Sequence, residues 1–214
     1  MKPIAALDED FAKYVNENLK IIGSTEALWL TAPPASDIRR QLKVPQLEAL
    51  YESIYLRIFA AWESFIEDIL VRFMSGYMTV TYQPVLAPGC PRSSSIKGAR
   101  GNLYGPRVYL LWHDPIRSAD RIAHYVTGSP LEAVIRGQQV RLEIFAAIRH
   151  RIAHDSDDAK AKFNSAAITL TSSNYAGRPG RLLRAADLSD PLNLPKWILK
   201  ISTEFIDIAH LILK

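Results

Sequence analysis

The chain has 214 residues, of which 48% are hydrophobic and 22% charged, a balance typical of a globular protein with a core. Its formal net charge is +4, and its single cysteine, Cys90, excludes an intramolecular disulfide and a zinc site built on paired cysteines. The absence of an apolar run of about 18 residues excludes a membrane helix. We therefore expect one domain over residues 1–214, no secretory signal in the acidic start MKPIAALDEDF, and a cytoplasmic protein.

Apolar residues that recur every three or four positions predict three long helices. The first covers residues 7–31, and we expect it to fray or stop near Gly23 and the segment TAPPAS. The second covers 45–75 and has the widest apolar face of the chain. The third covers about 194–213. These helices are long enough to build a bundle.

Residues 77–107 are rich in Pro, Gly and Ser, and we predict that they are irregular. A stretch of about 30 residues is too long for a plain connection, which indicates a functional or mobile segment. Two short helices are predicted after it, near 115–126 and 130–136. Ser129 is the expected N-cap of the second, with Glu132 closing a capping box.

A further helix is predicted over about 138–157, followed by a helical stretch near 158–166 and a short strand in the segment ITLTSS. Strand signals are few, whereas four or five substantial helices are expected. The fold class is therefore all-α, most simply a helical bundle.

Positive charge is concentrated in two segments that contain no acidic residue, 69–113 and 159–186. Because they hold ten of the 26 basic residues and none of the 22 acidic ones, the remainder of the chain is net negative. Such segregation favours binding to a polyanion such as nucleic acid, although loops also use Lys and Arg for solubility. The basic residues are Arg72, Arg92, Lys97, Arg100, Arg107, Lys160, Lys162, Arg178, Arg181 and Arg184.

The sequence RHRIAH, residues 149–154, places two arginines and two histidines late in an apolar helix. At about 100° per residue, Arg149 and His154 lie about 140° apart, whereas His150 and His154 share one face. Two interpretations are open. A basic last turn suits the helix dipole and can be solvated. Alternatively, arginine as a fixed cation and histidine as a proton carrier suit a cleft for phosphates, which a two-fold partner would complete.

These residues resemble the HEPN domain family, whose signature is written R-x4-6-H and is matched by Arg149 and His154. The helical stretch ALYESIYLRIFAAWESFIEDIL resembles the HEPN helix that packs against the motif helix. The tail is similar to bacterial stand-alone HEPN-like nucleases of the RiboL-PSP-HEPN type, and the resemblance spans residues 45–213. It implies a HEPN-like bundle with a long irregular insertion between the second long helix and the motif helix.

The resemblance also implies a metal-independent endoribonuclease without a cofactor, usually a homodimer with one composite cleft. Attack of the RNA 2′-OH would leave 2′,3′-cyclic phosphate and 5′-OH ends. His154 would be the general base or acid, Arg149 would hold the scissile phosphate and stabilise its charge, and His150 would orient the cleft. The expected RNA-binding residues are Lys97, Arg100, Arg107, Arg151 and Arg181.

Related proteins typically act as toxins or antiviral effectors, so an antitoxin or a defence-system partner is an expected partner besides RNA. Some HEPN toxins have a tyrosine two residues after the motif histidine, as a target of modification. Ser156 stands there, which gives no support to that regulation. The alternative function is a non-catalytic HEPN subunit that dimerises or binds a nucleotide in a larger complex.

Three other interpretations concern acidic residues and histidines elsewhere in the chain or at the end of the motif. Glu63 could face the cleft, but we expect it at the solvated edge of its helix. His113-Asp114 and His154-Asp155 raise a metal-dependent HD-type phosphohydrolase, although Asp114 is better explained as a helix cap. A structural zinc site is disfavoured by one cysteine and five scattered histidines.

Overall fold

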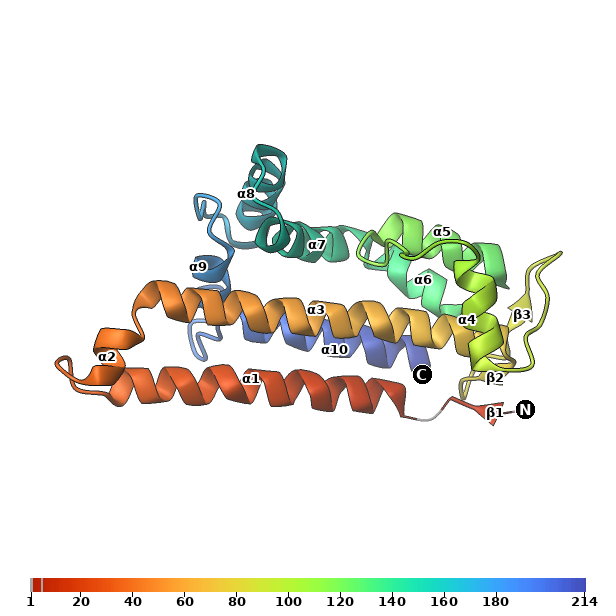
Figure 1. Cartoon of the computed structure of the whole chain (residues 1–214), viewed down its shortest axis with the longest axis horizontal. Coiled ribbons are helices and arrows are strands. Elements are labelled where there is room, and N and C mark those ends of the chain that lie inside the picture. Colours follow the sequence, from red (N-terminus) through yellow and green to blue (C-terminus); the bar gives the residue numbers. More distant parts are fainter. Residues whose placement is uncertain (1, 5) are drawn as a thin grey trace. The chain divides into compact units, whose positions relative to one another are not determined.

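The computed structural model describes residues 2–4 and 6–214 and is two-thirds helical, with 67% helix and 4% strand (Figure 1). This content confirms the all-α prediction. In the described ranges, none of the helices is both long and apolar enough to cross a membrane.

The residues group into two compact units, and four helices contribute residues to both. The first unit contains the residues up to Phe11 with Ala61–Glu143 and Phe205–Lys214, and the second contains Ala12–Ala60 with Ile144–Glu204. The shared helices are α1 (Leu7–Thr31), α3 (Val44–Met74), α7 (Gln139–Ala153) and α10 (Trp197–Leu213). That residues 1–214 fold as one domain stays a prediction.

The first unit has an aromatic core and a set of short elements around it. Phe11 stacks on Phe65 with ring centroids 5.3 Å apart, and Trp62 lies 5.2 Å from Phe205. All four rings are buried, which gives this unit its apolar centre. The short elements are α4 (Ile96–Tyr104), α5 (Pro115–Tyr125), α6 (Pro130–Gly137), the parallel pair β1 (Lys2–Pro3) and β2 (Tyr77–Met78), and the antiparallel pair β3 (Val85–Leu86) and β4 (Val126–Thr127).

The predicted starts of the two short helices are confirmed by their caps. The carboxylate of Asp114 accepts the amide of Arg117 at 3.0 Å, and Ser129 accepts the amide of Glu132 at 3.1 Å. The Glu132 side chain pairs with Arg136 at 2.9 Å, so the cap of α6 is Ser129 alone rather than the predicted reciprocal box. The prediction of an irregular 77–107 is wrong in part, because Ser95 caps the nine-residue helix α4 within it.

The second unit contains the first half of α3, most of α7 and all of α8 (Asp157–Thr171), together with α2 (Asp37–Gln41) and α9 (Pro179–Arg184). Its largest fully buried side chains include Tyr51, Tyr55, Phe145 and Phe163. The Tyr55 hydroxyl donates to the carbonyl of Phe145 at 2.8 Å, which ties α3 to α7 inside the core.

Two boundaries in this unit differ from the predictions. Helix α7 ends at Ala153 rather than near 157, because Ser156 caps the next helix by accepting the amide of Ala159. The predicted strand in ITLTSS is wrong, since α8 continues to Thr171. The hydroxyls of Thr169 and Thr171 donate to carbonyls one helical turn back, so both are satisfied within the helix.

The predicted break near Gly23 is also absent, and α1 runs through it to Thr31. No heavy atom lies within 4 Å of where a Cβ of Gly23 would be, so this glycine meets open space. One glycine in a 25-residue helix weakens it by about 1 kcal/mol, which tertiary packing readily overrides.

Candidate functional site

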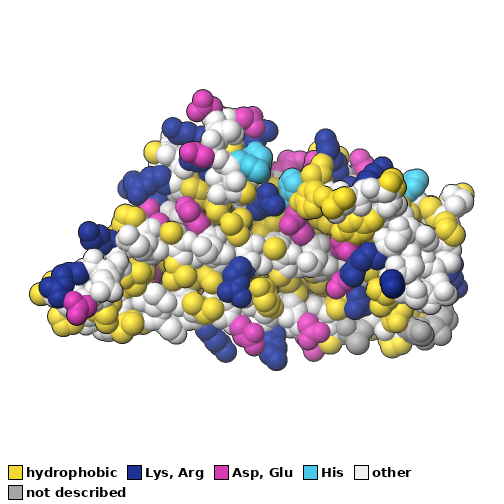
Figure 2. Space-filling model, viewed as in Figure 1, with side chains coloured by type: hydrophobic (Ala, Val, Ile, Leu, Met, Phe, Trp, Pro, Cys, Tyr) yellow, Lys and Arg dark blue, Asp and Glu magenta, His cyan; other side chains and the backbone are white. Residues whose placement is uncertain are grey.

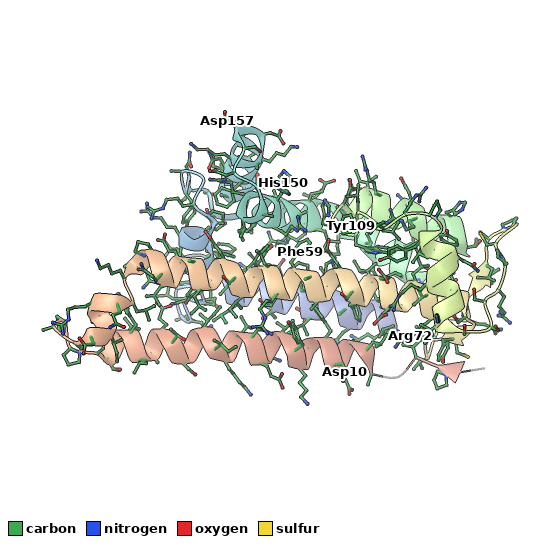
Figure 3. All side chains as sticks on the ribbon, in the orientation of Figure 1. Asp10, Phe59, Arg72, Tyr109, His150 and Asp157 are labelled. Carbon is green, nitrogen blue, oxygen red and sulfur yellow. The ribbon has the colours of Figure 1, made fainter. Side chains whose placement is uncertain are left out.

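The motif occupies the end of α7, where a buried helix reaches the surface of the second unit. Phe145 and Ile148 are fully buried, whereas Arg149 and His150 are half-buried and His154 is exposed. In Figure 2, histidine side chains are exposed where Figure 1 draws α7 and α8, and Figure 3 labels His150 there. One face of the helix therefore anchors the motif while the other presents it to solvent.

The two histidines form a pair, as their spacing predicted. Their ring centroids lie 4.6 Å apart, and the amide of His154 donates to the carbonyl of His150 at 2.9 Å. Burial, with the nearby charges of His154, Lys162 and Arg149, lowers the pKa of His150 below its ordinary value. The His150 imidazole is therefore neutral near pH 7 and able to accept a proton.

The two arginines of the motif have different surroundings. The guanidinium of Arg151 donates to three oxygens: the carbonyl of Gly177 at 3.0 Å, the carbonyl of His154 at 3.0 Å and the carboxylate of Asp155 at 2.7 Å. Its side chain is only 18% exposed. Arg151 thus fixes the chain directly after α7, including the backbone of His154.

Arg149, by contrast, has an uncommitted side chain. Across residues 2–4 and 6–214, its guanidinium makes neither a hydrogen bond nor an ion pair. The ring nitrogens of His150 and His154 likewise have no hydrogen-bond partner in the described part of the chain. A half-buried cation and two adjacent imidazoles without partners are suited to bind an anion and to move a proton.

Helix α8 and the loop before α9 complete the surroundings of the motif. Lys162 pairs with Asp158 at 2.8 Å, and both charges act on His150. The amide of Gly177 donates to Asn164 at 2.8 Å, so the carbonyl that receives Arg151 is held by α8. Gly177 has a φ of +71°, and a Cβ there would lie 2.8 Å from the Lys160 side chain.

Sequence reasoning missed Lys162, Asp158, Asn164 and Gly177 as parts of this site. Lys162 was predicted only as one of the basic residues of 159–186, and its i, i+4 spacing from Asp158 is typical of any exposed helix face. Asn164 and Gly177 carry no local signal, because their role depends on how α8 and the following loop fold back.

The predicted RNA-binding residues are not all in one unit. Lys97, Arg100 and Arg107 belong to the first unit, and Arg151 and Arg181 to the second. Arg100 pairs with Glu67 at 2.8 Å and Asp68 at 2.7 Å, while Lys97, Arg107 and Arg181 are exposed. Their contact with RNA stays a prediction.

Three of the residues considered for other chemistry lie in the first unit: Glu63, His113 and Asp114. The Glu63 side chain is 15% exposed and lies 3.5 Å from Nδ1 of His113, so its predicted place at a solvated helix edge is wrong. Asp114 caps α5, as predicted. In the described residues, His, Cys, Asp and Glu side chains do not gather in a group of three or more that could hold a metal ion.

The chain matches no protein-family model, no curated protein and no solved structure.

Proposed function

We propose that this protein is a metal-independent endoribonuclease of the HEPN type, with Arg149, His150 and His154 as its reactive residues. The main support for the proposal is the end of α7, which carries within six residues an uncommitted guanidinium and a pair of uncommitted imidazoles. In a solvated last turn with a purely structural role, lysines would do as well. One arginine with two histidines instead matches the needs of phosphodiester cleavage.

The chemistry needs no cofactor, because RNA supplies its own nucleophile. A neutral imidazole accepts the proton of the 2′-OH, and the 2′-oxygen attacks the adjacent phosphorus. The bond to the 5′-oxygen breaks, and that oxygen takes a proton from a second acid. The products carry a 2′,3′-cyclic phosphate and a 5′-OH.

Each motif residue receives a role from its surroundings. His154 is exposed and serves as the general base or acid that reaches the RNA. His150, whose pKa is lowered by burial and nearby cations, is neutral at pH 7 and orients the cleft or relays the proton. Arg149 has its donors available for the extra negative charge of the transition state, and a preorganised donor of this kind contributes about 10²–10³-fold to the rate.

The proposed dimer and biological role follow from the resemblance to the HEPN family. A homodimer would bring two motifs into one cleft, so that base and acid can approach the phosphate from opposite sides. The basic residues Lys97, Arg100, Arg107 and Arg181 would guide the RNA backbone without sequence preference. A toxin or antiviral role, with an antitoxin or defence partner, belongs to the same proposal.

The test is cleavage of a mixed-sequence RNA by the purified protein in EDTA, with product ends identified by mass spectrometry. We expect cyclic-phosphate products from the wild type, a rate lower by about 10²–10⁴-fold for His154→Ala and by about 10²–10³-fold for Arg149→Ala. The matched control is His124→Ala, which removes an exposed histidine of the first unit and should leave the rate unchanged.

The other outcomes overturn the proposal in different ways. Equal cleavage by the wild type and both motif variants would indicate a contaminant or another site. Cleavage that requires an added metal ion would support the HD-type alternative. A folded wild type without cleavage on its own or with its partner would support the non-catalytic HEPN subunit.

A further inference from the structure

A second feature of the second unit, separate from the motif, is an apolar groove between α1 and the segment that leads into α10. Its volume is about 370 Å³, within the range of small-molecule sites. One wall is formed by Leu19, Ile22 and Leu30 of α1, and the other by Leu194, Ile198 and Leu199. Leu30 is 61% exposed and Leu194 48% exposed, so apolar side chains at the rim face solvent.

A charged cluster closes one side of this groove. Glu26 is 6% exposed, and its carboxylate accepts from Arg184 through Nε at 3.1 Å and Nη2 at 3.0 Å. The other carboxylate oxygen receives the Tyr51 hydroxyl and the Lys196 ammonium, and Lys196 also donates to Tyr51 at 2.8 Å. Glu26, Tyr51 and Lys196 all line the groove.

The charges in this cluster do not balance. One carboxylate, whose oxygens are already saturated by four donors, faces two cations, Arg184 and Lys196. An ammonium has three hydrogens, and Lys196 uses two of them on Glu26 and Tyr51. Its side chain is 30% exposed and lines the groove, and the described residues offer no acceptor for the third hydrogen.

We propose that this groove binds a small amphiphilic carboxylate, with its apolar chain between α1 and residues 194–199 and its carboxylate on Lys196. The apolar walls select the chain, and the excess positive charge selects an anion over a cation or a neutral head. The volume suits a single unbranched chain of roughly ten carbons.

The test uses decanoate below the concentration at which it forms micelles, and measures binding to the full chain by isothermal titration calorimetry. Decyltrimethylammonium, with the same chain length and the opposite charge, is the matched ligand. We expect saturable one-to-one binding of decanoate and at least tenfold weaker binding of the cation.

Two variants locate the site without depending on one fragile residue. Gly23 lines the groove, and open space surrounds the position of its Cβ, so Gly23→Phe fills the groove while the helix gains a better helix former. Its control is Ser24→Phe, the next, exposed position of α1 and outside the groove lining. Lys196→Met keeps the stem and removes the charge.

We expect Gly23→Phe and Lys196→Met to weaken decanoate binding at least tenfold and Ser24→Phe to leave it unchanged. Equal binding of decanoate by Gly23→Phe and the wild type would overturn the site. Equal binding of both ligands would overturn the role of Lys196, and no binding by the folded wild type would overturn the proposal as a whole. Because the motif residues are not touched, RNA cleavage should be the same in Gly23→Phe as in the wild type.

Discussion

The end of α7 and the cluster of Glu26, Tyr51, Arg184 and Lys196 (the Glu26 cluster) both contain charged side chains, but only those of the Glu26 cluster are paired. At the end of α7, Arg149, His150 and His154 reach the surface without partners in the described part of the chain. In the Glu26 cluster, a carboxylate that is 6% exposed is saturated by a tyrosine, an arginine and a lysine. Charged side chains that stabilise the fold and charged side chains that are available to a ligand are therefore told apart by their hydrogen-bond partners, and not by their residue types.

The difference has a physical cause. A buried carboxylate is tolerated only if each of its oxygens is hydrogen-bonded, so Glu26 has to be paired for the unit to fold. Its pKa is lowered because the bonds from Lys196 and Tyr51 and the charges of Lys196 and Arg184 outweigh the opposing effect of burial. The motif side chains keep enough contact with water to remain unpaired, which leaves them available to a ligand.

The largest effect is expected for Glu26→Ala. Removing the carboxylate leaves the buried Tyr51 hydroxyl and two cations without their common acceptor, and the free energy of unfolding should fall by about 3 kcal/mol. Urea denaturation measures it. The control is Asp37→Ala, which breaks an ion pair with Arg40 whose side chains are 78% and 67% exposed, and should change stability by less than about 0.5 kcal/mol. Equal changes in both variants would show that the buried Glu26 carboxylate stabilises the fold no more than an exposed ion pair does.

A smaller effect is expected for Arg151→Met, which tests the structural arginine of the motif. Loss of its charged hydrogen bonds to Gly177 and His154 should lower the free energy of unfolding by about 2 kcal/mol. RNA cleavage should also fall, because the His154 backbone is no longer fixed. Arg57→Met, an exposed arginine of α3, is the matched control and should leave both stability and cleavage unchanged. An unaltered stability would show that these bonds do not hold the loop.

The next prediction concerns pH. His150 has a lowered pKa, so its ring takes up a proton only below the ordinary histidine range, and an RNA-cleavage step that needs it neutral is lost as the pH falls through that value. Lys162→Gln removes one of the cations that lower the pKa and leaves Asp158, which raises it. The NMR titration midpoint of His150 should therefore move upward.

Lys43→Gln, an exposed lysine between α2 and α3, serves as the control for the pH experiment and should leave the His150 midpoint unchanged. A downward movement in Lys162→Gln would contradict the assigned causes.

The smallest change in stability is expected for Arg149→Met. Because its guanidinium has no partner among the described residues, the free energy of unfolding should change by less than about 0.5 kcal/mol while RNA cleavage falls. Thermal and urea unfolding beside the cleavage assay give both values. A loss of stability above about 1 kcal/mol would place Arg149 with the structural charges.

The sequence predicted the long helices well, because their apolar periodicity reflects burial directly. Helix α3 was expected over 45–75 and covers Val44–Met74, and the caps at Asp114 and Ser129 use local bonds that a short stretch encodes. The strand predicted in ITLTSS is wrong. β-Branched residues favour strands only weakly, and the burial of Phe163 and Ala167 on one face of α8 outweighs that preference.

The site could be predicted only in part. The shared face of His150 and His154 follows from a spacing of four, and the rings are indeed adjacent. The different roles of Arg149 and Arg151 could not be predicted, because the acceptor of Arg151 is the carbonyl of Gly177, 26 residues away. A backbone acceptor leaves no trace in residue types, and neither do the approach of Lys162 and the position of Asn164.

The bond between Arg151 and Gly177 has a consequence for motion. One guanidinium holds both the loop before α9 and the carbonyl of His154, so a local opening of that loop also releases the end of the motif. Exchange of the Gly177 amide, which is bonded to Asn164, therefore reports on the same opening that loosens His154. The loop before α9 and the end of the motif therefore open together, and anything that stabilises the loop also keeps the motif in place.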